Sequence, residues 1–222
     1  PPAASNFIDP LIRARPAPRS APFALVGDVT GSSRARRQLR AMAQNGVATT
    51  VIQTSAARDP GALPEGVALD VLPVPPGGGP AAFWRAHRAV GAAVLARPAG
   101  LYWASDLYTL PALARAARRH HARLVYDSRE LYAALDSAHG RPWVGAVWGA
   151  VERRHIHRAD AVLTVGDAIA DRLADRYRIA RPTVLYNAPA AAPTAPDRTA
   201  LRRAMSLPDD GRVVVLYQGL FR

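Results

Sequence analysis

The stretch RLVYDSRELY, residues 123–132, indicates how this chain folds. Leu124, Val125 and Tyr126 form an apolar run without alternation, which is typical of a strand buried on both faces in a parallel sheet. Four polar residues, 127–130, follow directly. Because ligands of open α/β sheets bind beyond the carboxyl ends of the strands, these side chains are candidates for a functional site. The alternative is a strand exit in which an Asp–Arg ion pair only holds the loop.

The composition of the 222 residues limits the classes of protein to which the chain can belong. With 49% hydrophobic residues it can bury a full core, which excludes global disorder. It contains no cysteine, so disulfides, thiolate metal sites and cysteine nucleophiles are excluded. The sequence has no run of about 18 apolar residues, and we expect no segment of it to span a membrane.

The charge of the chain is strongly positive. There are 29 Lys+Arg against 17 Asp+Glu, a net charge of +12, and every one of these cations is arginine. Arginine suits bidentate contacts with phosphate, so the excess favours attraction to nucleotides, nucleic acid or anionic lipid headgroups. The alternative is a coding bias, because the chain is also rich in alanine, proline and glycine.

Apolar runs alternate with amphipathic segments along most of the chain. We expect helices from about Ser32, at residues 81–97, after Asp106, at residues 142–159 and after Asp167. The runs that we expect to form strands are residues 23–27, 47–53, 67–74, 100–105, 124–126, 161–166 and 183–186. This alternation predicts an α/β fold, a Rossmann-like doubly wound parallel sheet with helices on both faces.

Two further strand ends carry candidate site residues. The turn GDVTG at residues 27–31 leads from the first strand into a helix, and such a turn can point backbone N–H groups at an anion. Its G-x-x-x-G spacing differs from that of dinucleotide-binding and Walker loops, so a tight turn that only needs glycine is the alternative. Asp106 follows the strand expected at residues 100–105.

Composition divides the chain into four segments. Residues 1–22 are interpreted as a flexible lead-in, residues 23–189 as the Rossmann-like domain and residues 190–196 as a linker. Residues 197–222 are expected to begin a second domain, with a helix at 197–205, a strand at 212–217 and a glycine turn at Gly219. Since a lone strand lacks pairing partners, we expect this second domain to be incomplete in the chain.

An ordered set of motifs resembles the family-4 type of GT-B glycosyltransferases. Together the motifs cover nearly all of residues 23–222. They are the turn at residues 27–31, ASDLYTLPAL at 104–113, YDSREL at 126–131, VERRHIHRADAVLTVGDAIADRLADRY at 151–177, VLYNAP at 184–189 and VVVLYQG at 213–219.

The resemblance implies a retaining enzyme with its active site between two Rossmann-like domains. It implies transfer of a sugar from a nucleotide-sugar donor to a hydroxyl of a carbohydrate or lipid-linked acceptor. This chain would supply the acceptor-side domain and, at Gly219, the start of the donor-diphosphate loop, and we expect it to be inactive alone. No cofactor or metal is implied, since cations and helix N-termini can stabilise the leaving diphosphate.

The resemblance and the composition also indicate a location. We expect a cytoplasmic protein, with no specific nucleic acid as a partner. The arginine excess, together with Trp143 and Trp148, predicts peripheral association with an anionic membrane surface, at the inner face of the plasma membrane.

The resemblance places a set of residues in or near the cleft, and Arg129 is the main departure among them. Many relatives have histidine there, in a Y-D-S-H-E run. Arginine cannot act as a general base at neutral pH, so Arg129 is expected to bind a phosphate or carboxylate of the acceptor, with Glu130 orienting it. The acceptor or cleft candidates are Gly27, Asp28, Gly31, Asp106, Asp127, Arg129 and Glu130.

Two other functions remain open from the sequence. A Rossmann-type oxidoreductase or epimerase would need G-x-G-x-x-G after the first strand, which the turn at residues 27–31 lacks. A basic, non-enzymatic module that binds nucleic acid or anionic surfaces is supported by the charge of +12. Against it, the sequence has no recognisable nucleic-acid motif, and its arginines are spread along the chain.

Overall fold

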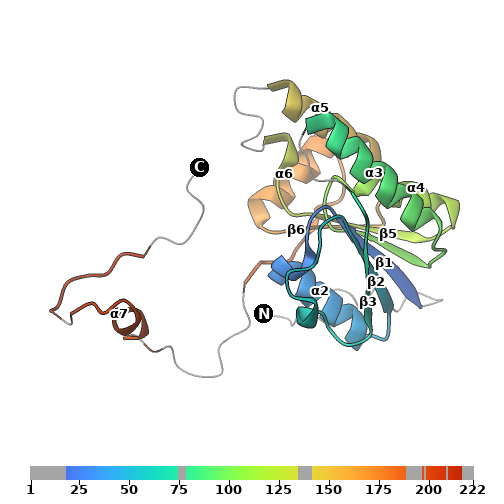
Figure 1. Cartoon of the computed structure of the whole chain (residues 1–222). Coiled ribbons are helices and arrows are strands. Elements are labelled where there is room, and N and C mark those ends of the chain that lie inside the picture. The colour runs from blue at the N-terminus through green and yellow to red at the C-terminus, as the bar shows by residue number, and fades with distance from the viewer. Residues whose placement is uncertain are drawn as a thin grey trace. The chain divides into compact units, whose positions relative to one another are not determined.

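The computed structural model describes residues 19–74, 79–134, 142–188, 197, 199–208 and 210–216 (Figure 1). The chain divides into two compact units, Pro1–Asn187 and Ala188–Arg222. Residues 1–18 of the expected lead-in at 1–22 lie outside the described residues. The expected linker at 190–196 also lies outside them.

The first unit is built on a seven-stranded sheet. Its strands are β1 (Ser20–Leu25), β2 (Ala48–Gln53), β3 (Val67–Val71), β4 (Leu101–Ala104), β5 (Arg123–Ser128), β6 (Ala161–Thr164) and β7 (Thr183–Val184). They lie in the order β3-β2-β1-β4-β5-β6-β7, and every neighbouring pair is parallel. The predicted doubly wound parallel sheet is confirmed.

Helices cover both faces of this sheet, as predicted. The α-helices are α2 (Ser33–Gln44), α3 (Gly79–Leu95), α4 (Leu110–Arg119), α5 (Pro142–Ile156) and α6 (Asp167–Tyr177). Short 3₁₀ turns are η1 (Val29–Gly31), η2 (Pro60–Ala62) and η3 (Tyr132–Ala134). Figure 1 shows α2 on one side of the sheet and α3, α4, α5 and α6 on the other.

Two hydrophobic cores follow from the alternation of side chains along each strand. Phe23 of β1 and Trp103 of β4 are fully buried on the α2 side, where their rings stack 6.0 Å apart. Ala24 and Tyr102, one residue away in each strand, are buried on the side of α3 and α4. A sheet covered on both faces explains why the central strand β4 is a continuous run of buried, largely apolar residues.

The observed strand ends differ from the predicted ones where the sheet supplies partners. β1 begins at Ser20 and not at residue 23, because its first residues pair with β2, Ser20 opposite Ala48. β5 continues through Asp127 and Ser128, which pair with Leu163 and Thr164 of β6. β5 was therefore predicted too short at its carboxyl end, and its residues Asp127 and Ser128 are buried.

In the second unit, one predicted element is present and one is absent. The helix expected at residues 197–205 is shorter and forms α7 (Ala200–Ala204). The strand predicted at residues 212–217 was wrong for residues 212–216, which form no regular element and expose Val213 and Val215. A strand requires backbone partners, and no described strand pairs with this segment.

Candidate functional site

The strand order has a topological switch point between β1 and β4, at their carboxyl ends. From β1 the chain winds toward β2 and β3, and from β4 it winds in the opposite direction toward β7, so the order reverses between β1 and β4. Ligands of doubly wound folds bind outside the strands at this point. The two ends are joined directly, because the amide of Val26 donates to Oδ2 of Asp106 over 2.8 Å.

Asp106 is the most deeply buried of the predicted site residues at this position. Only 2% of it is exposed, and its Oδ1 accepts from the amide of Thr109 over 2.8 Å. Burial raises the pKa of the Asp106 carboxyl, while the Val26 amide, the charge of Arg129 and Thr109 act in the opposite direction. Asp106 thus holds the β1 and β4 loops together and contributes a carboxylate to the site.

The predicted turn at residues 27–31 needs only one of its two glycines. Gly27 has φ +121°, which residues with a side chain rarely adopt, whereas Gly31 has no positive φ and lies in η1. Asp28 caps η1, since it accepts from the amide and hydroxyl of Thr30 and from the amide of Arg58. Burial opposes ionisation of the Asp28 carboxyl, but these hydrogen bonds outweigh it and lower its pKa.

Several backbone amides in and just before this turn donate to side chains of the protein. The amide of Gly27 donates to the Thr54 hydroxyl over 3.1 Å, and that of Val29 donates to the Gln53 side chain over 2.9 Å. With the amide of Val26 on Asp106 and that of Thr30 on Asp28, four N–H groups are occupied. These four amides are therefore not available to bind an anion at this strand end.

Arg129 brings a positive charge to the same position. Its guanidinium lies 3.5 Å from the hydroxyl of Ser32 and 3.9 Å from a carboxylate oxygen of Asp106, and the side chain is 25% exposed. Ser32 is the N-cap of α2, where its hydroxyl accepts from the amide of Ala35. Neither contact of Arg129 is short, so its donors are available to an anion beside the positive end of α2.

Glu130 has a different place from the predicted one. It is exposed, and no described contact joins its carboxylate to Arg129. Its carbonyl instead accepts from the Ser128 hydroxyl over 3.2 Å. Arg129 is thus oriented by Ser32 and Asp106, which come from the β1 and β4 loops.

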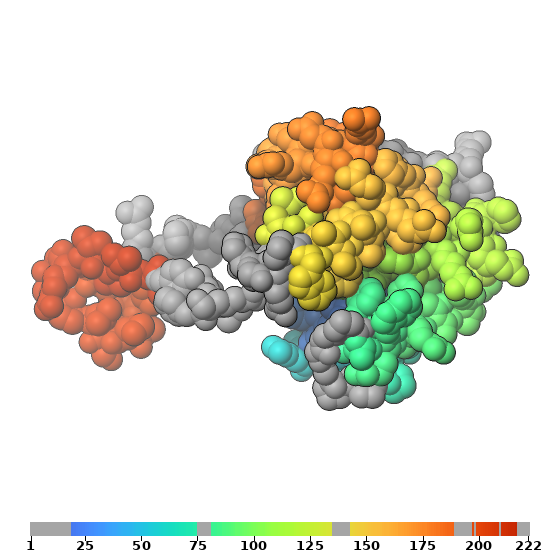
Figure 2. All heavy atoms as spheres, turned by 90° about the horizontal axis from the view of Figure 1, so that it is seen from above, coloured from blue at the N-terminus to red at the C-terminus, as the bar shows by residue number. Residues whose placement is uncertain are grey.

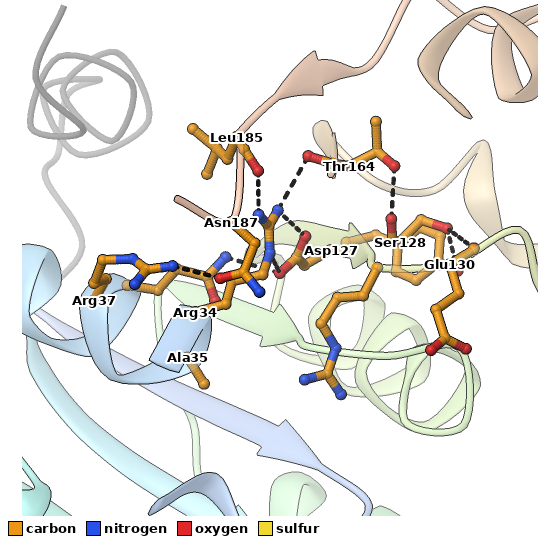
Figure 3. Close-up of polar contacts among 12 residues, drawn as sticks. Arg34, Ala35, Arg37, Asp127, Ser128, Glu130, Thr164, Leu185 and Asn187 are labelled. Atoms are coloured by element: carbon orange, nitrogen blue, oxygen red, sulfur yellow. Dashed lines mark hydrogen bonds and ion pairs between the residues drawn. The ribbon is translucent and has the colours of Figure 1, made fainter. Parts of the chain in front are cut away.

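Asp127 is separated from the crevice by its place inside β5 (Figure 3). It is fully buried, and Arg34 of α2 binds it with two hydrogen bonds, from Nε over 2.8 Å and from Nη2 over 2.6 Å. The side-chain amide of Gln38 also donates, through Nε2, to Oδ2 of Asp127 over 2.8 Å. An ion pair does occupy Asp127, as the alternative interpretation of this stretch allowed, but its partner lies 93 residues away in the sequence.

Arg34 is the residue that the sequence analysis missed. Besides Asp127, its guanidinium binds the carbonyls of Thr164 and Leu185, so it links α2, β5, β6 and the segment after β7 (Figure 3). A signal was present, because Arg34 and Gln38 lie four residues apart in the same stretch of α2 as the buried Ala35 and Leu39. Two polar side chains on a buried helix face require a buried partner.

Three further sequence-based expectations concern a metal site, a membrane-spanning segment and the glycine turn at Gly219. Among the described residues, no three His, Asp or Glu side chains gather as a metal-binding group. None of the helices in the described ranges is long and apolar enough to cross a membrane. Gly219, the candidate for the donor-diphosphate loop, lies outside the described residues.

Two solved structures with a similar fold are each about twice as long as the part that matches this chain. Sucrose-phosphate synthase from Thermosynechococcus elongatus matches 86% of this chain and 53% of its own, with a TM-score of 0.63 and 13% identity. Anabaena HepE, solved with UDP and glucose, matches over 83% of this chain and 50% of its own, with a TM-score of 0.53 and 15% identity. The chain thus spans about half the length of these proteins.

The comparison with family models gives the more specific result. A search of curated sequences returned no match. The family described as "Glycosyl transferase 4-like domain" matches residues 30–188, more than two-thirds of the chain. This range runs from η1 through α2 and the strands β2 to β7, and it includes Asp106 and Arg129. The resemblance seen in the sequence motifs is confirmed, and the chain belongs to the glycosyl transferase 4-like family of GT-B glycosyltransferases.

Proposed function

We propose that this chain is the acceptor-side part of a retaining glycosyltransferase. The reaction would move a sugar from a nucleotide-sugar donor to a hydroxyl of a carbohydrate or lipid-linked acceptor. The family supports the transferase class. The fold shared with HepE, a protein solved with UDP and glucose, supports a nucleotide-sugar donor.

The observation that carries this proposal is the guanidinium of Arg129 at the reversal of strand order. It lies beside the N-cap of α2 and near the buried Asp106, and its polar contacts with these described residues are 3.5 Å or longer. A permanently charged fork in a partly water-excluded position suits a phosphate or carboxylate of the acceptor. Arg129 would then orient the acceptor, and it would take no part in proton transfer.

The remaining parts of the proposal concern the donor side and the location. Charge that develops on the leaving diphosphate needs stabilisation by cations and helix N-termini, with no metal or cofactor in this proposal. We place most of those groups in the donor domain, so the 222-residue chain is proposed to be inactive alone. Arginine excess and the exposed Trp143 support a cytoplasmic protein that associates peripherally with an anionic membrane surface.

Nucleotide-sugar turnover tests the proposed reaction. We expect the protein as its native cell produces it to release nucleoside diphosphate from one of a panel of UDP-, GDP- and ADP-sugars, in the presence of lipid and carbohydrate acceptors. The 222-residue chain alone should give no release above the rate without enzyme. Consumption of the nucleotide-sugar without release of nucleoside diphosphate, or reduction of NAD in the same assay, would contradict the proposed sugar transfer.

Replacing Arg129 by methionine is expected to lower kcat/KM of the active protein by about 100-fold or more, because a charge-assisted contact with the acceptor is lost. The stability should change little, since both contacts of Arg129 are long. Arg172→Met, at an exposed position of α6, is the control and should keep full activity. Equal activity of both variants would remove Arg129 from the acceptor site.

A further inference from the structure

A groove of about 430 Å³ lies between α3, α4 and α5, and it shares no residue with the site at the strand ends. Figure 1 shows these three helices on one side of the sheet, and Figure 2 shows α3 in green beside α5 in yellow. Contact between the two helices is direct, since the rings of Phe83 and Trp148 meet edge to face at 4.9 Å. The size of the groove is that of a small-molecule site.

Four exposed arginines converge on this groove from two helices and the turn that follows one of them. Arg115 and Arg118 come from α4, Arg154 from α5 and Arg158 from the residues after α5. No ion pair of the described residues involves any of the four, and no carboxylate from that part of the chain lines the groove. Each of the seven described ion pairs lies elsewhere, so this is a concentration of unneutralised charge.

Two histidines also line the groove. His87 of α3 has a buried Nδ1 without a hydrogen-bond partner among the described residues, and His155 of α5 uses its Nδ1 on the carbonyl of Val151 at 2.8 Å. Burial lowers the pKa of His87, and the charges of His155 and Arg115 lower it further. Burial likewise lowers the pKa of His155, together with the charges of Arg158 and Arg154. The groove therefore resists further positive charge until an anion is bound.

One wall of the groove is aromatic. Trp84 is 60% exposed and meets the ring of His87 edge to face at 5.9 Å. Phe83 stacks on His87 at the same distance of 5.9 Å. A ring or an aliphatic chain attached to an anion would find a surface here that phosphate alone would not use.

We propose that this groove is a binding site for an organic phosphate, whose phosphate group pairs with the arginines while its carbon skeleton lies against Phe83 and Trp84. Four guanidiniums that form no ion pair with a described carboxylate supply the charge complementarity, and arginine binds phosphate oxygens in a bidentate manner. The phosphate belongs either to a soluble metabolite or to the headgroup of a lipid. The site goes beyond the proposed transfer reaction and does not depend on it.

Calorimetric titration with phenyl phosphate tests the soluble source, and co-sedimentation with phosphatidylcholine vesicles that contain phosphatidic acid tests the lipid source. The test variant is Arg115→Gln with Arg154→Gln. Its control is Arg40→Gln with Arg172→Gln, which removes two exposed charges from α2 and α6 and leaves the same net charge. Thermal unfolding checks that both variants are folded.

We expect binding in at least one assay, weakened about tenfold or more in the groove variant and less than twofold in the control. Phenyl phosphate should bind more tightly than inorganic phosphate, and Trp84→Ala should remove that difference. Binding to vesicles alone would assign the phosphate to a lipid headgroup. No binding in either assay, or equal losses in groove variant and control, would overturn the proposal.

Protonation of the two histidines supplies a second readout. An anion beside His87 and His155 should raise the pKa of both imidazoles, against the effect of Arg115 on His87 and of Arg154 and Arg158 on His155. We expect the NMR titration of both rings to move to higher pH when phenyl phosphate is added. An unchanged titration at saturating ligand would place the bound phosphate elsewhere.

Discussion

Replacing Arg34 by leucine is expected to lower the free energy of unfolding by about 3–5 kcal/mol, because it leaves the Asp127 carboxylate buried without its cation. Arg34 is 5% exposed and Asp127 is fully buried, so water cannot compensate for the loss. The carbonyls of Thr164 and Leu185 lose a donor in the same step. Urea unfolding followed by circular dichroism measures the change.

The design of this experiment separates a buried ion pair from a general effect of removing arginine. Arg37→Leu, in the same helix, removes an exposed contact with Asn187 and should change the stability by at most about 0.5 kcal/mol. The double variant Arg34→Leu with Asp127→Leu should recover a large part of the loss, since no unpaired charge remains. A loss below about 1 kcal/mol for Arg34→Leu would mean that the pair is not desolvated in solution.

Replacing Glu152 by alanine is expected to cost about 3–5 kcal/mol, because three hydroxyls lose their common acceptor. Glu152 is fully buried in α5 and accepts from Tyr126 over 2.6 Å, from Tyr177 over 2.8 Å and from Ser128 over 3.1 Å. It therefore ties α5 and α6 to β5. Glu152→Gln keeps one acceptor oxygen and should lose about half as much.

The contribution of Glu152 to the free energy of unfolding depends on pH. Burial raises the pKa of Glu152 above its ordinary value of 4.5, although Tyr126, Tyr177 and Ser128 act in the opposite direction. The folded state therefore binds this proton more tightly than the unfolded state, and the contribution is present below pH 4.5 and lost as the pH rises through the raised pKa.

Urea unfolding of the native protein and of Glu152→Gln between pH 7 and pH 4.5 measures this contribution. We expect the stability of the native protein relative to Glu152→Gln to increase as the pH falls. Glu130→Gln, at an exposed position, is the matched control and should stay within about 0.5 kcal/mol at each pH. A difference that is constant with pH would contradict a buried carboxyl with a raised pKa.

The fold class could be predicted because local apolar runs and their spacing carry it. Strands such as β4 and β5 are buried on both faces, and their continuous apolar sequences show this without any tertiary information. Strand ends were less accurate, since they depend on pairing. β5 continues through Asp127 and Ser128 because they pair with β6, whereas residues 212–216 pair with no described strand and form none.

For the candidate site, too, the sequence predicted the residues but not the contacts between them. Gly27, Asp106 and Arg129 were predicted as site residues because each lies just beyond an apolar run, and the carboxyl ends of parallel strands share one edge of the sheet. The sequence contained no information on the contact between the Val26 amide and Asp106, or on the approach of Arg129 to Ser32. These contacts require β1, β4 and β5 to be neighbours, which is a property of strand order.

Local sequence was therefore sufficient to identify the helices and strands of the first unit, because hydrophobic periodicity acts over a few positions. The exact strand ends, and the absence of a strand at residues 212–216, depended on pairing. Partners of buried polar groups were decided by packing. Asp127 binds Arg34, 93 residues away, and Glu152 binds Tyr126, 26 residues away. Desolvation makes such partners obligatory, but only the three-dimensional arrangement of α2, α5 and the sheet determines which side chains they are.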